Sequence, residues 1–234
     1  MKKRLLMLAA ATLYCGAYGL TFVSAGNGAK PSESFTKAHV HFEQNATDED
    51  VEVVFEVKGG SEGLAKLNVI SPDGRTVVNF TAPDASTLGI RQFRFESPEP
   101  KDVKGLKAAY PEGVYTFMGE TAAGVKLEGK STLNHTLPTP TSFVQPKAKA
   151  EGVPVKSLVV AWAPVKNVAA YIIYIEQDEL QVEFTARLAG TATKLAVPDG
   201  FLVPGTQYTL GLGTVTEDGN VSIIETWFTT AETN

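Results

Sequence analysis

The stretch Leu202-Val203-Pro204-Gly205-Thr206-Gln207-Tyr208 gives the clearest indication of the fold. Proline and glycine form a turn, after which Tyr208, Leu210 and Leu212 alternate with small or polar residues. Such alternation places one face of a strand in a core. A tyrosine here can hydrogen-bond back to the backbone where the chain crosses between the sheets of a β-sandwich. The stretch therefore predicts a sandwich in the second half of the chain.

Strands on both sides of this stretch show the same two-residue period. Leu158, Val160 and Trp162 alternate inward, and Pro164 closes their strand. The large indole of Trp162 suits the space between two sheets. Further strands are expected at Tyr171–Ile175, Val182–Ala186, Leu195–Val197 and Ile224–Phe228.

With these elements, residues 140–231 resemble a fibronectin type III domain. The resemblance implies that the strands of Tyr171, Tyr208 and Phe228 are neighbours in one sheet. It is carried by Leu158-x-Val160-x-Trp162-x-Pro164, the Tyr171 strand, Leu202-x-Pro204-Gly205-Thr206-x-Tyr208 and Phe228-Thr229-Thr230.

The first half predicts a second, more divergent sandwich. Six or seven short strands separated by turn formers fit into about a hundred residues, which is typical of an immunoglobulin-like sandwich. A turn with a similar order of proline, glycine and tyrosine, though a weaker match, occurs at Pro111-Glu112-Gly113-Val114-Tyr115. The region also resembles the front part of uncharacterised secreted bacterial proteins through Asn45-Ala46-Thr47-Asp48, Glu96-Ser97-x-Glu99-Pro100 and Tyr110-Pro111-Glu112-Gly113. The strands are expected at Lys37–Glu43, Val51–Lys58, Leu64–Ile70, Thr76–Thr81, Arg91–Phe95, Val114–Gly119 and Lys126–Leu133.

The N-terminus reads as a signal peptide. Lys2, Lys3 and Arg4 precede an uncharged apolar stretch, and Val23-Ser24-Ala25 offers a cleavage site. The predicted division of the chain is 1–25 signal peptide, 26–36 flexible segment, 37–136 immunoglobulin-like sandwich, 137–146 proline-containing connector or first edge strand, and 147–234 fibronectin type III-like domain.

Charge and cysteine content exclude several classes of function. The leader carries three of the 21 basic residues and none of the 26 acidic ones, so the exported chain has a net charge of −8. An acidic chain without a basic run is a poor partner for nucleic acid or anionic lipid. The single cysteine, Cys15, lies in the leader, which excludes thiolate chemistry and disulfides in the exported chain.

The pair His39-x-His41 is the main candidate for metal binding. Residues two apart on a strand share a face, so both imidazoles could hold one metal ion. The two histidines alternate with core-facing Val40 and Phe42, so we expect them to be solvated strand residues and predict no metal site. The third histidine, His135, is not expected to converge with them.

A surface patch is the main candidate for binding. Alternation from the inward residues places Ile172, Tyr174 and Trp227 outward over glycines of the strand between them. Exposed apolar patches often mark contact surfaces. The alternative is that the aromatic rings merely cover these glycines, or that the patch docks on the first sandwich.

These observations predict an exported, non-catalytic binding protein of the bacterial envelope or exterior. The three histidines have no evident acid–base partners for nucleophilic catalysis. We expect no cofactor, no integral membrane segment after export, and an envelope or extracellular protein as partner, in the periplasm or outside the cell. The alternatives are a carbohydrate-binding module that uses the exposed aromatics, and a metal-binding protein or metalloenzyme that uses His39 and His41.

Overall fold

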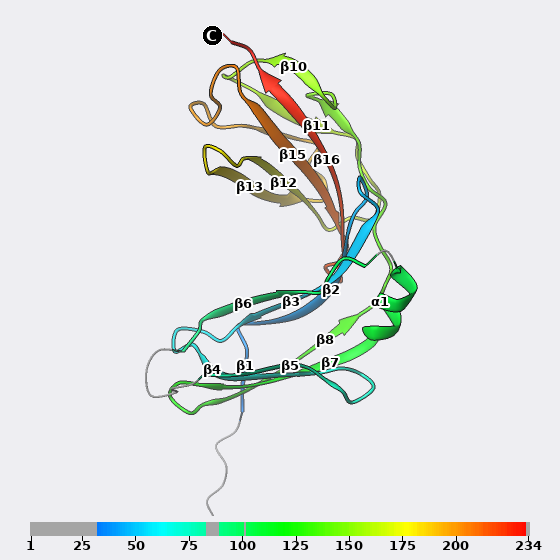
Figure 1. Cartoon of the computed structure of the whole chain (residues 1–234), viewed down its shortest axis with the longest axis vertical. Coiled ribbons are helices and arrows are strands. Elements are labelled where there is room, and N and C mark those ends of the chain that lie inside the picture. The colour runs from blue at the N-terminus through cyan, green and yellow to red at the C-terminus, as the bar shows by residue number, and fades with distance from the viewer. Residues whose placement is uncertain (1–31, 83–88, 101, 233–234) are drawn as a thin grey trace, which may run out of the picture. The chain divides into compact units, whose positions relative to one another are not determined.

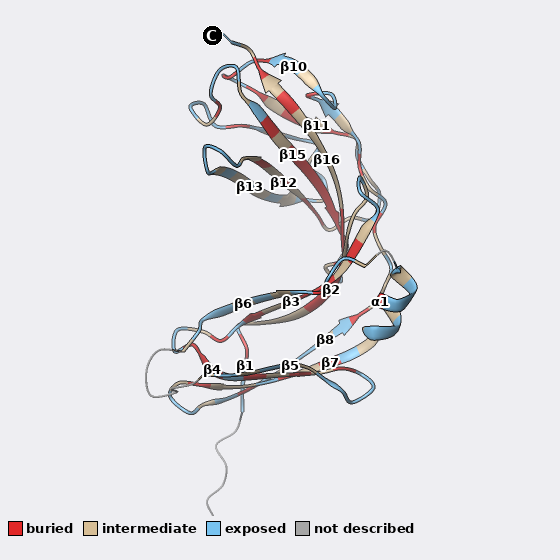
Figure 2. Cartoon of the chain, in the orientation of Figure 1, coloured by how far each residue is buried: buried red, intermediate tan, exposed pale blue. Residues whose placement is uncertain are grey.

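The computed structural model describes residues 32–82, 89–100 and 102–232, which are almost entirely β-structure (Figure 1). The predicted signal peptide, residues 1–25, lies outside the described residues, as do residues 26–31. The described part contains one α-helix, α1 (Val103–Ala109), and no helix there is long and apolar enough to cross a membrane. The predicted all-β fold class with sandwich architecture is confirmed, and the buried residues between the sheets form two main cores (Figure 2).

The first sandwich packs a five-stranded sheet against a group of three strands. The five-stranded sheet has the order β1-β8-β7-β4-β5 and the three strands have the order β2-β3-β6. Their bounds are β1 Glu33–Ser34, β2 Lys37–Asn45, β3 Asp50–Lys58, β4 Leu64–Ile70, β5 Thr76–Thr81, β6 Gln92–Glu96, β7 Gly113–Thr121 and β8 Lys126–Leu133.

The second sandwich packs a three-stranded sheet, β14-β11-β9, against the strands β13-β12-β15-β16. The prediction that the strands of Tyr171, Tyr208 and Phe228 are neighbours is confirmed, since β15 pairs with both β12 and β16. The bounds are β9 Phe143–Gln145, β10 Ala150–Val153, β11 Val159–Trp162, β12 Ala170–Gln177, β13 Val182–Ala189, β14 Lys194–Ala196, β15 Gln207–Val215 and β16 Val221–Thr230.

Both sandwiches contain a buried tyrosine that bonds back to the preceding turn. The Tyr208 hydroxyl accepts a hydrogen bond from the Val203 backbone N–H at 2.9 Å. The Tyr115 hydroxyl donates to the Pro111 carbonyl at 3.1 Å. Both side chains are fully buried, so each hydroxyl needs this partner to offset its desolvation. The sequence similarity between the turns before Tyr115 and Tyr208 thus corresponds to a tyrosine corner in each sandwich.

Two predicted segments are more ordered than expected. Glu33–Ser34 forms β1, which pairs with β8, and Phe35 is buried in the first core, so the prediction of a flexible segment over 26–36 is wrong at these residues. Burial of the Phe35 ring explains why the chain is held there. Within the predicted connector 137–146, β9 pairs with β11, which favours the edge-strand alternative.

A short parallel pairing joins strands from the two halves of the sequence. Residues Val221–Ile223 of β16 pair with Glu43–Asn45 of β2, so β13-β12-β15-β16-β2-β3-β6 is one continuous sheet. The buried side chain of Asn220 lies just before this pairing. Its Oδ1 accepts from the Phe42 N–H at 2.8 Å, and its Nδ2 donates to the carbonyl oxygens of Asn134 at 3.0 Å and Thr136 at 2.9 Å.

Candidate functional site

The predicted patch residues share the outer face of one sheet. Tyr174 on β12 pairs in register with Gly211 on β15, and Gly211 pairs with Glu225 on β16. Because side chains two apart share a face, Ile172 and Trp227 lie on this face as well. The parity assigned from the sequence is therefore correct for all three residues.

The expected exposed patch is nevertheless interrupted by a charge. Tyr174 lies flat over Gly211, where an added methyl group would overlap its ring, and its hydroxyl bonds to the Glu225 carboxylate. Burial, followed by Glu225, raises the pKa of Tyr174 well above its usual range. Ile172 packs in a small apolar cluster with Ile223. Tyr174 and Ile172 thus cover the glycines, as in the alternative interpretation, and Trp227 is half-buried.

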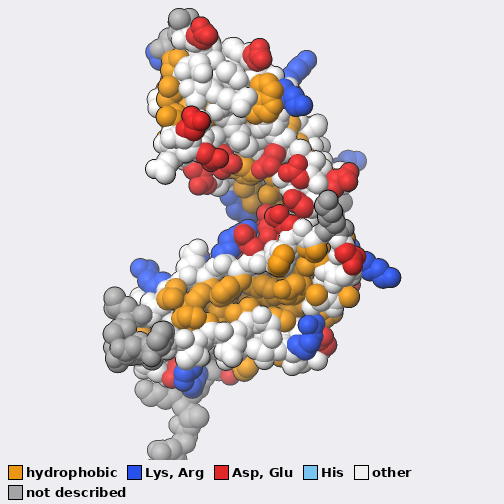
Figure 3. Space-filling model, in the orientation of Figure 1, with side chains coloured by type: hydrophobic (Ala, Val, Ile, Leu, Met, Phe, Trp, Pro, Cys, Tyr) orange, Lys and Arg blue, Asp and Glu red, His pale blue; other side chains and the backbone are white. Residues whose placement is uncertain are grey.

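A different apolar surface lies at the open side of the first sandwich. It consists of Val78 and Phe80 on β5 and Phe93 and Phe95 on β6, which we call the aromatic seam. The Phe80 and Phe93 rings are 4.9 Å apart between centroids, and the Phe93 and Phe95 rings stack at 5.4 Å. These side chains form part of the rim of the first core, and all four are only partly buried. Figure 3 shows a hydrophobic band between β5 and β6.

Strand order explains why the aromatic seam is accessible. β5 and β6 are the last strands of their respective sheets, and each faces the same open side. Their inward side chains therefore lack a further neighbour among the described strands. The sequence predicted strands at Thr76–Thr81 and Arg91–Phe95, but it contained no information on which strands would be edges.

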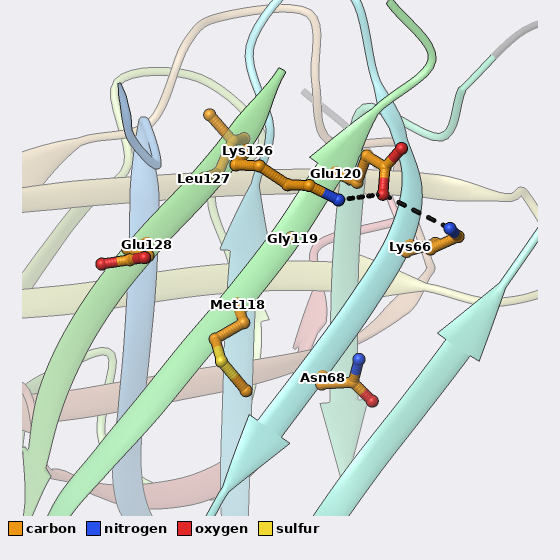
Figure 4. A pocket seen from close by; sticks show the side chains of 8 residues that line it. All are labelled: Lys66, Asn68, Met118, Gly119, Glu120, Lys126, Leu127 and Glu128. Carbon is orange, nitrogen blue, oxygen red and sulfur yellow. Dashed lines mark hydrogen bonds and ion pairs between the residues drawn. The ribbon is translucent and has the colours of Figure 1, made fainter. Parts of the chain in front are cut away.

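A hollow of about 270 Å³ lies over the outer surface of β4, β7 and β8 (Figure 4). Glu120 is paired across the sheet with Lys66 and Lys126 and binds both ammonium groups, at 3.3 Å for Lys66. The hydrogen bonds from Lys126 and then Lys66 lower the pKa of Glu120. Glu120, Lys66 and Lys126 satisfy one another, whereas Glu128 and Asn68 line the hollow without joining this group (Figure 4).

The histidine pair differs from the expectation of two solvated residues. His41 is only 4% exposed, and His39 is half-buried. Glu56 pairs with His39 across the β2–β3 hairpin, and one donor atom from each of His39, His41 and Glu56 lies within 4.8 Å of the other two. His135 is elsewhere, with its Nε2 at 2.9 Å from the Tyr110 carbonyl. Glu56 was not predicted as a member of this group, although the short turn between the two strands places it opposite His39.

Neighbouring charges tune the acidic residues around this pair. The His39 ring and the Lys37 ammonium, which is 2.6 Å from Glu56 Oε2, hold the pKa of Glu56 well below its usual range despite desolvation. The pKa shift has the opposite direction at Glu52, which lies four residues before Glu56 on β3. Burial, together with Glu43 and Glu96, raises the pKa of Glu52 to about 7.

Comparison with known proteins gives matches among solved structures only. No protein-family model and no curated protein matches the chain. Fibronectin(III)-like modules of Clostridium thermocellum CbhA match at 10% identity and a TM-score of 0.33, covering 85% of this chain and 93% of theirs. A two-domain fibronectin type III segment of chicken tenascin matches at 15% identity and a TM-score of 0.31, covering 85% and 100%. The FN1–FN3 domains of chicken CNTN1 match at 10% identity and a TM-score of 0.32, covering 86% of this chain and 67% of theirs.

Because these TM-scores are below 0.5, the fold assignment rests on the features of the chain itself. The second half has two sheets of three and four principal strands, with Trp162 buried between them. Tyr208 forms a tyrosine corner at the turn that opens its strand. The second half of this chain is a β-sandwich with a tyrosine corner, and it follows another β-sandwich in the first half.

Proposed function

We propose that this chain is an exported, non-catalytic binding protein that contacts a partner protein through the aromatic seam of its first sandwich. The single observation that carries the proposal is the row of Val78, Phe80, Phe93 and Phe95, which are partly exposed between two edge strands and in which the Phe93 ring contacts those of Phe80 and Phe95.

Two physical properties of the aromatic seam support protein binding. Contiguous partly exposed aromatic rings gain free energy when a partner removes them from water, and aromatic residues dominate the energetics of interfaces. Edge strands also carry backbone N–H and C=O groups without a strand partner, which can accept an added strand. A partner that supplies an extended segment with apolar side chains would cover the aromatic rings and pair with the backbone groups of an edge strand.

Export is supported by the sequence rather than by the fold. The basic and then apolar N-terminus is typical of a signal peptide. The acidic charge of that chain favours protein or glycan partners over nucleic acid. We therefore propose that the exported protein resides in the periplasm or outside the cell.

Site-specific photo-crosslinking in the producing bacterium tests the proposed surface. A photoreactive phenylalanine analogue replaces Gln92, which is exposed on the outer face of edge strand β6 where an added strand would pair, or Met118, which is 42% exposed on the outer face of β7. We expect a discrete protein adduct from position 92 and none from position 118. A second change, Phe93→Lys, should abolish the adduct because it places a charge in the aromatic seam.

Two results would refute the proposed surface. One is equal crosslinking from positions 92 and 118, and the other is an adduct that persists in the folded Phe93→Lys protein. Glycan binding that Trp227→Ala abolishes and Phe93→Lys leaves intact would instead favour the carbohydrate alternative. Circular dichroism of each variant shows whether the sandwich has formed.

A further inference from the structure

We propose that His39, His41 and Glu56 form a binding site for one divalent first-row transition-metal ion, with zinc as the ion that suits the donors best. The inference is independent of the proposed partner surface, because the three side chains share the outer face of β2 and β3, whereas Phe93 and Phe95 of the neighbouring strand β6 point to the opposite face, toward the first core.

Both imidazoles carry a ring nitrogen with no partner. His39 Nδ1 and His41 Nδ1 are buried atoms without a hydrogen-bond partner among the described residues. A buried polar atom left unpaired is costly, and its persistence calls for a physical explanation. The two rings stack with their centroids 5.2 Å apart.

The other nitrogen of each ring is already used in the manner of a metal ligand. His39 Nε2 is 3.0 Å from the Asp218 carbonyl, and His41 Nε2 is 3.2 Å from Glu43 Oε2. Because a carbonyl or carboxylate oxygen only accepts, each Nε2 carries the proton and each neutral ring has its lone pair on Nδ1. Metal-ligating histidines are oriented by this type of second contact.

Glu56 completes a set of two nitrogens and one oxygen. Its Oε2 is 3.9 Å from His39 Nδ1, a distance too long for a hydrogen bond but suitable for two ligands of one ion. Ligand atoms around a tetrahedral zinc ion with bonds of about 2.1 Å lie about 3.4 Å apart. The observed spread, up to 4.8 Å, requires side-chain adjustments of about 1 Å.

The surroundings allow an ion to enter and favour its charge. A hollow of about 870 Å³ is lined by the three ligands and by Glu43, among others. The carboxylates of Glu43 and Glu56 face the histidines, and Lys37 and Arg94 partly balance them. Lys37 binds one oxygen of Glu56, so the ion must share this carboxylate or displace Lys37 from it. Two imidazoles and a carboxylate suit zinc, with copper as the strongest competitor.

Calorimetric titration of the untagged, chelator-treated protein with Zn²⁺ tests the site. We expect one equivalent to bind, and His39→Gln and Glu56→Gln to weaken binding at least as much as the roughly 100-fold that loss of an orienting partner can cause. His41→Gln should have the same effect. His135→Gln and Glu128→Gln are matched controls, and both should bind as the wild type does.

Two further measurements keep the test decisive if the buried His41 variant fails to fold. Zn²⁺ should raise the melting temperature of the wild type and of His135→Gln, but not that of His39→Gln. Co²⁺ in place of Zn²⁺ should give visible absorption bands that His39→Gln removes. The proposal is overturned if the wild type binds less than one equivalent, if His39→Gln and Glu56→Gln both bind like the wild type, or if His135→Gln weakens binding equally.

Discussion

At the scale of single residues, Glu52 has a protonation equilibrium set by its surroundings. It is half-buried on β3 and pairs with Glu43 across the hairpin. Burial, followed by repulsion from Glu43 and Glu96, raises the pKa of its carboxyl to about 7, and Arg94 offsets this only in part. The folded protein therefore holds a proton on Glu52 at pH values where the unfolded chain has already released it.

This shift predicts a loss of stability as the pH rises from about 4.5 to about 7. In that window the folded state binds more protons than the unfolded state, so the free energy of unfolding falls with pH. Because Glu52 is half-exposed, solvent screening reduces the effect to about 1 kcal/mol. Urea unfolding at pH 5 and pH 8 should show a smaller decrease for Glu52→Gln than for the wild type.

The Glu52 prediction has an internal control. Glu128→Gln removes an exposed carboxylate on β8 and should leave the pH dependence as in the wild type. The stabilising shift of Glu56 has the opposite sign and is lost only as the pH falls below about 4.5, so it lies outside this window. Equal slopes for the wild type and Glu52→Gln would contradict the raised pKa.

At the scale of elements, the turn between β15 and β16 depends on one glycine. Gly219 has φ +92°, and a Cβ atom there would lie 2.7 Å from His39 Nε2. The conformation and the close approach both exclude a side chain. The same turn presents the Asp218 carbonyl to His39, so its shape determines where the histidine ring lies.

Gly219→Ala should destabilise the protein more than a glycine replacement that meets no neighbour. Gly74 is the matched control, since its φ is +84° and nothing lies within 4 Å of an added Cβ. We expect Gly74→Ala to cost about 1 kcal/mol from backbone strain. Gly219→Ala should cost about 1–2 kcal/mol more because the His39 ring must shift. Thermal unfolding measures both, and equal costs would show that the ring moves away freely.

At the scale of the whole molecule, Asn220 connects distant parts of the sequence. Its side chain is only 2% exposed and bonds to the backbone of β2 and of the segment after β8. Each of these bonds satisfies a backbone group near the β16–β2 pairing. Removal of the amide would leave several groups without partners at once.

Asn220→Ala should therefore affect cooperativity as well as stability. We expect a loss of about 3 kcal/mol, because the Phe42 N–H and two carbonyl groups lose their partner. The wild type should unfold in one calorimetric transition, and the variant should resolve into two as the cores become less coupled. Asn134→Ala, which removes one of the side-chain partners, should retain a single transition. A single, unchanged transition in Asn220→Ala would contradict this view.

Local alternation determined a large part of the fold. The strands Leu64–Ile70, Thr76–Thr81 and Lys126–Leu133 were predicted with the bounds that the structure shows, because a two-residue period is set by neighbouring residues alone. The tyrosine corner at Tyr208 was predicted from the Pro204-Gly205 turn that precedes its strand. The short helix α1 was not predicted, because its seven residues are too few to show a clear helical period.

The candidate sites depend on contacts between residues far apart in the sequence. Strand parity correctly placed Tyr174 and Trp227 on one face, and it placed His39 and His41 opposite the first core. It could not show that His41 is buried, that Glu56 joins the histidines, or that Phe80 and Phe93 meet at an open side. Side-chain direction along a strand is a local property, whereas the neighbours that cover or expose that face are chosen only when the sheets assemble.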